Sequence, residues 1–398
     1  MTIKGRQSPE VPVIERRARR IENSQIRGVP GANLIGWPRL QNGMGEYLRE
    51  IARALTVTGP PFGIKDVSQM SSTLPGDDSV AAYVREHCAY NANLFVVNAD
   101  NMKTTCDLIG TETIATRFNI ALWAWELSEF PDEWCRRMNT IDEIWGFSSF
   151  TQQSLAAKAT IPVLCMRQPV TLQSPAPLGR LDFGIPENRF VFLFQFDFTA
   201  FIDRKNPYAC IAAFRKAFPH DRSDVLLVIK TNNSERYPEQ LRQLVQTVGD
   251  DPAILLIHGA FRRDKITSLM ALADAFVSLH RSEGFGRSLA ETMLLGKPVI
   301  ATNYSGNTDF MRPDNSCLVN YSLIPVRTGQ YPFSEGQVWA DPDINHAAWH
   351  MRRVVQNRPY AELISRKAQQ TIAEEYNLSV TGKRYLKRLE LLGLVGQS

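Results

Sequence analysis

The sequence has 398 residues, of which 44% are hydrophobic and 22% are charged, a balance typical of a soluble globular protein rather than a disordered one. At roughly 100–200 residues per domain, this length predicts two domains. The formal net charge of +4 is small for this size, and it argues against a nucleic-acid-binding protein, whose basic residues are more numerous and concentrated.

Signals for secretion, membrane insertion and metal binding by cysteine are missing from the sequence. The first residues, MTIKGRQSPEVPV, lack the apolar core of a secretory signal, and no run of about 18 apolar residues predicts a membrane-spanning helix. The six cysteines include no C-x-x-C pair, which argues against a zinc or thioredoxin site. We therefore expect a reduced, cytoplasmic protein.

Residues 1–30 are expected to form an N-terminal arm. Within it, Ile14–Ile21 carries four arginines on a short stretch that can form a helix. Each basic residue near an anionic membrane surface contributes roughly 1 kcal/mol, so peripheral contact with the cytoplasmic face of the inner membrane is one hypothesis. The other hypothesis is a solvated N-terminal helix, because the apolar face is only a few residues wide.

The first half of the chain, residues 31–175, predicts strands interrupted by helices and loops. An opening strand at Asn33–Trp37 leads through a glycine loop to a helix over Glu46–Leu55. Pro131 and the two acidic residues after it predict another helix start, because helix N-termini favour both residue types. Further strands are predicted at Leu94–Asn98, Ile120–Trp125, Ile144–Phe147 and Pro162–Met166. We expect a first Rossmann-like domain, on the acceptor side of a cleft.

The segment Gln168–Gly179 contains three prolines and predicts a linker, with the domain boundary near residue 175. After it, residues 176–375 alternate short strands with helices of about ten residues, as in βαβ units on a parallel sheet. Several of these strands are apolar without alternation, as expected when helices cover both faces of a sheet. The predicted strands are Phe190–Phe198, Val225–Lys230, Ile254–His258, Ala275–Leu279 and Pro298–Thr302. The predicted helices are Asn206–Phe218, Glu239–Val248, Lys265–Ala273 and Ser288–Leu295.

The end of the chain predicts one polar, amphipathic helical stretch over Tyr360–Leu392, and residues 376–398 are expected to pack back toward the first domain. Asp341 and Asp343 have the spacing of a metal-binding D-x-D, but they precede a helix, so an N-cap is the favoured interpretation. Two Rossmann-like, doubly wound α/β domains that face each other predict a ligand cleft where the carboxyl ends of their strands meet.

The most specific motif is Leu279–Glu291 (LHRSEGFGRSLAE), in which a strand ends, a glycine-rich turn follows and a helix begins. The two glycines let a ligand approach the backbone, and the helix N-terminus favours an anion such as a diphosphate. Glu283 stands just before the turn and Glu291 about two helical turns later, so they can meet different parts of one ligand. The alternative is a glycine-rich turn with two solvated glutamates.

Together with the segments around it, this motif resembles the donor-binding domain of the retaining GT-B glycosyltransferases of family 4. The family pattern E-G-F-G-x-x-x-x-E, then G-x-P-V-I-A-T and a glycine-containing loop, is matched at Glu283–Glu291, Gly296–Thr302 and Ser305–Asp309. The resemblance spans about residues 189–320, and the first half joins it through Gly43–Glu46 and Trp123–Leu127. It implies a GT-B architecture, with residues 176–375 as the nucleotide-sugar-binding domain.

The resemblance also implies roles for the charged residues. Glu291 is expected to hold the ribose hydroxyls, since a carboxylate can accept two hydrogen bonds from a cis-diol. Glu283 is expected to bond the donor sugar, and Arg204 and Lys205 to face the two phosphates in place of a metal. The family's G-R pair is replaced here by Phe196–Phe198, so Arg204 is a substitute for its arginine. Neither a metal nor a cofactor is expected.

Other donor contacts are implied on the loops that follow the predicted strands. They are Gly43, Gly45, His258, Gly284, Phe285, Gly286, Ser305, Gly306 and Asn307. The first-domain histidine of many relatives has no counterpart, and Asp100 or Glu126 could serve instead. A weaker set of candidates is Asp100, Glu126, Lys230, His280 and Asp309. For His280 a structural role is favoured over a sugar contact. Four tryptophans, expected in the core, could alternatively stack on acceptor sugars: Trp123, Trp125, Trp134 and Trp145.

The expected function is that of a retaining glycosyltransferase in polysaccharide biosynthesis. Its donor would be a GDP- or UDP-linked sugar, GDP-mannose among them, and its acceptor a saccharide or lipid-linked glycan. Two alternatives stay open: a nucleotide-sugar-binding assembly protein that has lost catalysis, and a nucleotide-sugar epimerase on the same fold. A phosphorylase is disfavoured, because no motif for a pyridoxal-binding lysine is present.

Overall fold

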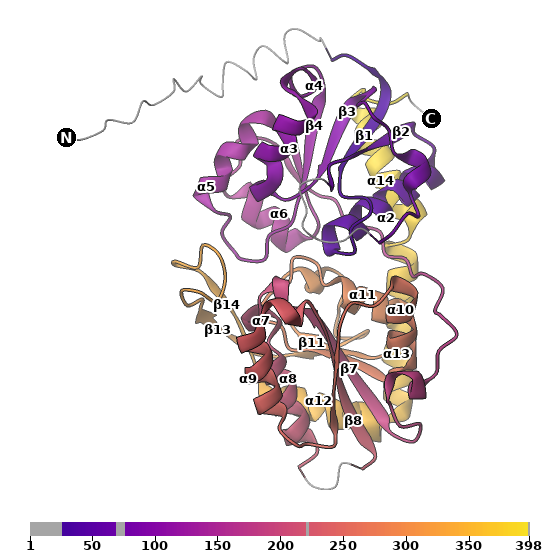
Figure 1. Ribbon diagram of the computed structural model, residues 1–398, viewed down its shortest axis with the longest axis vertical. Helices are drawn as coiled ribbons and strands as arrows, with labels where there is room; N and C mark the ends of the chain where they lie inside the picture. Colours follow the sequence, from indigo (N-terminus) through magenta and orange to yellow (C-terminus); the bar gives the residue numbers. More distant parts are fainter. Residues whose placement is uncertain (1–25, 69–75, 220–222, 397–398) are drawn as a thin grey trace, which may run out of the picture.

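The computed structural model describes residues 26–68, 76–219 and 223–396, which form two α/β domains, one above the other in Figure 1. Each domain is built on a parallel six-stranded sheet with helices on its faces. The predicted pair of doubly wound domains is therefore confirmed. The arginine-rich segment Ile14–Ile21 lies outside the described residues.

In the first domain the sheet has the strand order β2-β1-β3-β4-β5-β6. Its strands are β1 (Val29–Gly36), β2 (Phe62–Asp66), β3 (Tyr90–Val96), β4 (Phe118–Trp123), β5 (Glu143–Gly146) and β6 (Val163–Cys165). Its helices are α2 (Gly43–Thr58), α3 (Met102–Ile109), α4 (Thr111–Ala115), α5 (Asp132–Cys135) and α6 (Ser149–Ala156). The predicted strands are present, and β2 is an additional one. Pro131 is the N-cap of α5, which is a single turn.

In the second domain the strand order is β12-β11-β10-β7-β8-β9. Its strands are β7 (Phe190–Asp197), β8 (Val225–Asn232), β9 (Ile254–His258), β10 (Ala275–Ser278), β11 (Val299–Thr302) and β12 (Cys317–Val319). Its helices include α7 (Ile202–Lys205), α8 (Pro207–Ala217), α9 (Pro238–Val248), α10 (Arg263–Leu272), α11 (Arg287–Leu294) and α12 (Ile344–Gln356). The strand order reverses between β7 and β10, and a ligand crevice is expected at such a point.

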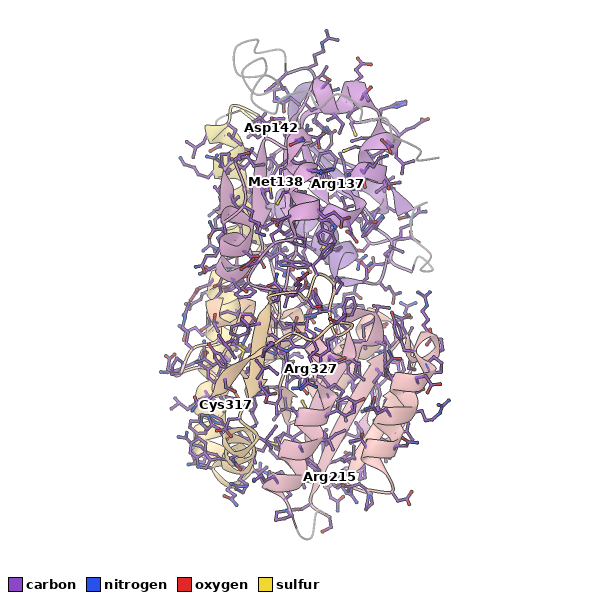
Figure 2. All side chains as sticks on the ribbon, turned by 90° about the vertical axis from the view of Figure 1, so that its left-hand side faces the viewer. Arg137, Met138, Asp142, Arg215, Cys317 and Arg327 are labelled. Atoms are coloured by element: carbon purple, nitrogen blue, oxygen red, sulfur yellow. The ribbon has the colours of Figure 1, made fainter. Side chains whose placement is uncertain are left out.

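An antiparallel hairpin of β13 (Tyr321–Pro325) and β14 (Val338–Pro342) projects from the second domain beside the junction of the domains (Figure 1). In the view turned by 90°, Arg327 from its loop lies nearer the first domain than Arg215 and Cys317 do (Figure 2). Asp343 follows β14 and accepts hydrogen bonds from the amides of residues 345 and 346, which confirms the predicted N-cap.

The helical stretch predicted over Tyr360–Leu392 is divided in the structure into two helices, α13 (Arg358–Glu375) and α14 (Leu378–Leu391). Asn377 separates them, and its side chain accepts a hydrogen bond from the amide of Val380, which begins a new helix. Helix α13 packs beside α11, whereas α14 crosses to α2 of the first domain (Figure 1).

Glycine allows the close approach of α14 to α2, because a Cβ at Gly382 would lie 2.7 Å from the Ala54 carbonyl oxygen. Residues 166–176, in the predicted linker region, form neither helix nor strand. None of the helices in the described part of the chain has the length and hydrophobicity of a membrane span. Trp123, Trp125 and Trp145 are buried in the core, so only Trp134 of the four tryptophans is partly exposed.

Candidate active site

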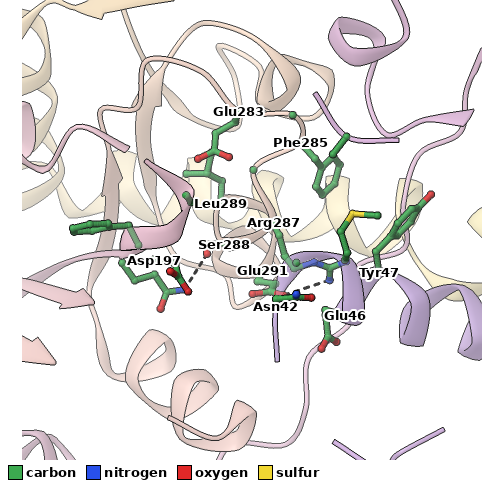
Figure 3. Close-up of a pocket in the computed structure, with 18 of the residues that line it drawn as sticks. Asn42, Glu46, Tyr47, Asp197, Glu283, Phe285, Arg287, Ser288, Leu289 and Glu291 are labelled. Carbon is green, nitrogen blue, oxygen red and sulfur yellow. Dashed lines mark hydrogen bonds and ion pairs between the residues drawn. The ribbon is translucent and has the colours of Figure 1, made fainter. Parts of the chain in front are cut away.

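A cleft of about 540 Å³ lies between the two domains, within the range of small-molecule sites. It is lined by the first turns of α2 and α11 and by the ends of β7, β8 and β10. Figure 3 shows Glu283 and Glu291 of the second domain in the same pocket as Asn42 and Glu46 of the first. The cleft therefore brings together the glycine-rich motif and the glycine loop that the sequence separates by about 240 residues.

The glycine-rich turn is held by close backbone packing. Gly286 has a φ of +91°, a conformation that glycine adopts without strain. A Cβ at Gly306 would lie 2.2 Å from the Gly284 carbonyl oxygen, so this contact also requires glycine. The same carbonyl accepts hydrogen bonds from Ser148 Oγ at 2.6 Å and Thr151 Oγ1 at 3.2 Å, both in the first domain. These contacts fix the turn against the opposite wall of the cleft.

Glu283 lies in the cleft with both predicted phosphate-binding cations on its carboxylate. Arg204 Nη1 is 3.3 Å from Glu283 Oε2, and Lys205 Nζ donates a short hydrogen bond to Oε1. Burial opposes ionisation of this carboxyl, but Lys205 and Arg204 outweigh it and lower the pKa of Glu283 to about 2. The three residues predicted as catalytic thus form one charged cluster that lines the cleft, with Arg204 and Glu283 buried and Lys205 partly exposed.

Glu126 extends this cluster from the first domain. Its Oε1 is 3.9 Å from Arg204 Nη2, and its Oε2 accepts a hydrogen bond of 2.6 Å from the hydroxyl of Tyr331. Tyr331 belongs to the loop between β13 and β14, and nothing in the sequence motif indicated that it reaches this site. Asp100, the other candidate for a first-domain acid or base, is exposed and does not line the cleft.

Glu291 is fully buried and has one paired and one unpaired carboxylate oxygen. Arg263 donates a short hydrogen bond to Oε1, and Arg287 Nη1 is 3.5 Å from the same oxygen. Among the described residues, Oε2 has no hydrogen-bond partner. A buried polar atom without a partner is destabilising. A ligand hydroxyl that donates a hydrogen bond to this oxygen would remove that cost.

Arg263 and Arg287 line the cleft but were not predicted as site residues. Their place in the sequence could have indicated this, because each is the first residue of a helix that follows a predicted strand: Arg287 begins α11 after Gly286, and Arg263 begins α10. Arg287 Nη2 also donates to Gln168 Oε1 at 2.5 Å, from the segment that joins the domains. Together with Glu291 they place two cations near the turn where an anion is expected.

Glu46, in the first turn of α2, faces these arginines across the cleft. Its carboxylate accepts a 2.6 Å hydrogen bond from Arg49. Burial raises the pKa of Glu46, but the arginines at 287, 49 and 263 outweigh it and hold the pKa well below its usual range. The first domain therefore contributes a fixed negative charge opposite a cationic wall.

The two glycines of the α2 loop have different surroundings. Gly43 lines the cleft, and its position is open, since a Cβ there would meet nothing within 4 Å. Gly45 instead packs against the chain, because a Cβ there would lie 2.3 Å from the Leu40 carbonyl oxygen. Its amide donates to Asn42 Oδ1 at 2.8 Å, and Gly45 is not among the residues that line the cleft.

Several other predicted donor contacts lie behind the motif rather than in the cleft. The amide of Gly306 donates to the Glu283 carbonyl at 2.8 Å, and Ser305 Oγ accepts from the Glu283 amide. Asn307 Oδ1 is 3.1 Å from His280 Nε2, and both side chains are fully buried. These groups bond the motif from inside the domain and hold its turn in one conformation.

Asp309 and His258 also lie outside the cleft lining. Asp309 Oδ2 accepts a 2.8 Å hydrogen bond from the Ser149 amide at the start of α6, so it joins the two domains. His258 Nδ1 is 2.8 Å from Thr231 Oγ1, and its residue is exposed. Phe285 touches the cleft, but its ring packs against Phe310 with a centroid separation of 5.0 Å.

Lys230, at the end of β8, lines the cleft and is 1% exposed. Its ammonium donates a short hydrogen bond to Asn232 and lies 4.8 Å from the ring centroid of Phe261. Burial lowers the pKa of Lys230 to about 8. In the part of the chain that the structure describes, no group of three or more His, Cys, Asp or Glu side chains is arranged to hold a metal ion.

Comparison with known proteins agrees with this geometry. Residues 182–371 match the family model described as "Glycosyl transferases group 1". No curated protein sequence matches the chain significantly. Among solved structures, the chain is similar to HepE of Anabaena in complex with UDP and glucose, with 16% identity and a TM-score of 0.64 over 91% of this chain and 100% of that one.

Two further solved structures have the same overall likeness. A glycosyltransferase from Rickettsia africae ESF-5 is 15% identical, with a TM-score of 0.65 over 91% of this chain and 99% of that one. The sucrose-phosphate synthase of Thermosynechococcus elongatus is 14% identical, with a TM-score of 0.66 over 92% and 99%. At these identities the likeness establishes the fold, which is GT-B as predicted.

Proposed function

We propose a glycosyltransferase function for this chain, which has the GT-B fold and whose residues 182–371 match the family model of the glycosyl transferases group 1. In this proposal it moves a sugar from a nucleoside-diphosphate sugar to an acceptor hydroxyl, with retention of the anomeric configuration. The observation that carries it is the cluster of Glu283, Arg204 and Lys205 in the cleft beside the first turn of α11.

The proposed donor extends along the motif. Its diphosphate lies at the turn before α11, where the helix N-terminus and the cations at positions 204 and 205 favour negative charge. Its sugar lies by Glu283, which is ionised and can accept hydrogen bonds from sugar hydroxyls. Its ribose hydroxyls bond the free Oε2 of Glu291. No metal is required in this arrangement, because fixed cations face the phosphates.

The proposed reaction breaks the bond between the anomeric carbon and the β-phosphate oxygen, and the electron pair leaves with the nucleoside diphosphate. The acceptor oxygen bonds the anomeric carbon from the same face, and its proton passes to the departing phosphate oxygen. Charge develops on that phosphate, so Arg204 and Lys205 should supply the largest catalytic contribution. Closure of the two domains would exclude water, which otherwise hydrolyses the donor.

The finer proposals concern substrates and location. The complex of HepE with UDP and glucose supports testing UDP-linked donors first, and GDP-mannose remains a proposed donor. The proposed acceptor is a saccharide or lipid-linked glycan of polysaccharide biosynthesis, at the cytoplasmic face of the membrane. Retention is part of the proposal because the residue pattern at Glu283–Glu291 resembles that of retaining enzymes.

The test is to incubate the full chain with UDP-glucose, UDP-N-acetylglucosamine, GDP-mannose and ADP-glucose, with and without saccharide acceptors, and to measure nucleoside diphosphate release. We expect release from one donor, at a rate that Lys205→Met lowers about 100-fold and that chelation of divalent metals leaves unchanged. Lys103→Met, at an exposed lysine, is the matched control. The anomeric configuration of the product, followed by NMR, tests retention.

Three results would contradict the proposal. Binding without release would favour the nucleotide-sugar-binding assembly protein. Isomerisation of the sugar without transfer would favour the epimerase. Failure to bind any nucleotide sugar would overturn the assignment of the cleft itself.

A further inference from the structure

Lys230 is a buried cation that no carboxylate neutralises directly. Its residue is 1% exposed, and no carboxylate oxygen of the described residues lies within ion-pair distance of its ammonium. Asp197 acts on it from farther away, while its own oxygens accept hydrogen bonds from Thr199 and Asn233. A buried charge without a charged partner is destabilising, so its retention in a cleft points to a ligand.

Lys230 lies beside an apolar wall of the cleft. Its ammonium stands over the ring of Phe261, which belongs to one apolar cluster with Ile266, Phe276 and Leu289. All four of these side chains line the cleft with Lys230. Hydrophobic and aromatic walls with a few placed polar groups, here Lys230 and Asn232, are typical of a small-molecule site, and such a wall can stack on a planar heterocycle.

Lys230 is also separated from the glycine-rich turn that begins at Glu283. The motif turn follows β10, and the sheet order β10-β7-β8 places Lys230 two strands away. At a strand spacing of about 4.8 Å, this is about 10 Å along the edge of the sheet. A nucleotide whose diphosphate lies at this turn would therefore present its nucleoside, rather than its phosphates, to the end of β8.

We propose that Lys230 donates a hydrogen bond to a keto oxygen of the donor's nucleobase, and that it selects uracil or guanine over adenine. An ammonium has three donors and no acceptor. Uracil and guanine carry a keto oxygen where adenine carries an amino group, which is itself a donor. The inference rests on the proposed function, since it names the nucleotide class that the same cleft accepts.

The protonation of Lys230 fits this role. Burial lowers its pKa to about 8, so the amine is mostly charged at pH 7. Among the groups around it, Asp197 favours the charged form of Lys230. Partial desolvation and the charge of Lys230 lower the pKa of His258, at the end of the neighbouring strand, and so favour its neutral form. A keto oxygen would supply a second acceptor for the charged amine, whose one hydrogen-bond acceptor among the described residues is Asn232.

The experiment is isothermal titration calorimetry of the full chain at pH 7 with UDP, GDP, ADP and inorganic pyrophosphate. We expect the wild type to bind UDP or GDP at least tenfold more tightly than ADP. Lys230→Met should lower the affinity for the preferred nucleotide, UDP or GDP, at least tenfold. It should change the affinities for ADP and pyrophosphate less than twofold. Lys265→Met is the matched control, because Lys265 also stands over the Phe261 ring, at 4.2 Å, but does not line the cleft.

A second variant keeps the inference testable if methionine disturbs the fold. Lys230→Gln supplies both a donor and an acceptor, so it should bind ADP and UDP with affinities within about threefold of each other. If Lys230→Met weakens the binding of pyrophosphate as much as the binding of UDP, Lys230 binds phosphate and the inference is wrong. Unchanged UDP and GDP binding, or a wild-type preference for ADP, would also overturn it. A wild type that binds neither nucleotides nor pyrophosphate would instead contradict the proposed function.

Discussion

At the scale of single residues, the two glutamates of the motif face one cleft with different partners. Both oxygens of Glu283 are occupied by cations, whereas Glu291 keeps one oxygen without a partner among the described residues. In the proposed function, Glu283 orients the cations that stabilise the leaving phosphate, and Glu291 binds a ribose hydroxyl that does not react. Their substitution should therefore affect different kinetic constants.

We expect Glu291→Gln to raise the KM for the nucleotide sugar about tenfold and to change kcat less than threefold, because ribose contacts are equal in the ground and transition states. Glu283→Gln should lower kcat about 100-fold, since it disturbs the cations at the departing phosphate. Steady-state kinetics of nucleoside diphosphate release would measure both. The exposed Glu362→Gln is the control. A pure kcat effect at Glu291 would contradict its assignment to the ribose.

Lys230→Met is expected to stabilise the ligand-free protein at pH 7. Burial lowers the pKa of Lys230 from 10.5 to about 8, so the unfolded state binds more protons between these values and stability rises with pH there. The loss of stability caused by burying the charged Lys230 is complete below pH 8 and disappears above pH 10.5. Since one pKa unit equals about 1.4 kcal/mol, we expect a gain of about 1–3 kcal/mol at pH 7.

Urea unfolding of the wild type and Lys230→Met at pH 7 and pH 10 would measure this gain, which should be smaller at pH 10. Lys265→Met should show no such pH-dependent gain. A variant that is less stable than the wild type at pH 7 would mean that the contacts with Asn232 and Phe261 outweigh the burial of the charge. A variant that is more stable than the wild type but binds the nucleotide more weakly would show that Lys230 lowers stability and contributes to ligand binding.

At the scale of elements, the β13–β14 hairpin completes the site from outside the two sheets. The ring of Tyr331 packs on Trp125 of the first domain at 5.6 Å and on Phe201 at 4.8 Å. Phe333, in the same loop, packs on Trp134 at 5.0 Å. These aromatic contacts hold the hydroxyl of Tyr331 on a cleft carboxylate, so one element of the second domain orients a group of the first.

We expect Tyr331→Phe to lower kcat about tenfold and to change the donor KM less than twofold. The variant keeps the ring but removes the hydrogen bond that holds Glu126 beside Arg204. Its free energy of unfolding should fall by about 1 kcal/mol. Tyr321→Phe, at an exposed tyrosine of the same hairpin, is the control. An unchanged kcat would mean that the orientation of Glu126 does not affect the reaction.

At the scale of the whole molecule, the chain crosses between the domains twice, and its return fastens the C-terminus to the first domain. Arg388 of α14 donates hydrogen bonds to both oxygens of the buried Glu143 in β5, and Glu143 also accepts from Trp145 Nε1 at 2.6 Å. The ring of Tyr385 stacks on Trp145 at 5.4 Å. A helix that follows the second domain is thus part of the core of the first.

Arg388→Met should lower the free energy of unfolding by about 2–4 kcal/mol, because it leaves the Glu143 charge buried without its partner. The exposed Lys387→Met, one residue earlier, should change it by less than about 0.5 kcal/mol. Urea unfolding followed by tryptophan fluorescence would measure both variants. Equal stability of Arg388→Met and the wild type would show that α14 does not hold the first domain through this ion pair.

The sequence by itself determined the second-domain strands, the turn and helix of Glu283–Glu291, and the fold class. These features depend on contacts between residues close in the chain: apolar runs form strands, and glycines followed by a helix start form an anion-binding turn. The position of Lys205 beside Glu283 was also accessible, because both residues matched a known pattern at known spacing.

Only the tertiary structure decided which other side chains enter the cleft. Tyr331 and Glu126 are 205 residues apart, and no local pattern relates them. Asn307 and Asp309 follow a strand as a donor-binding loop would, yet they turn to His280 and Ser149, because buried polar groups and a helix N-terminus needed partners there. The same reason ends α13 before Asn377, where a cap begins a new helix that the first domain buries. Long-range packing and the need to satisfy polar atoms set these positions, and neither can be deduced from spacing along the chain.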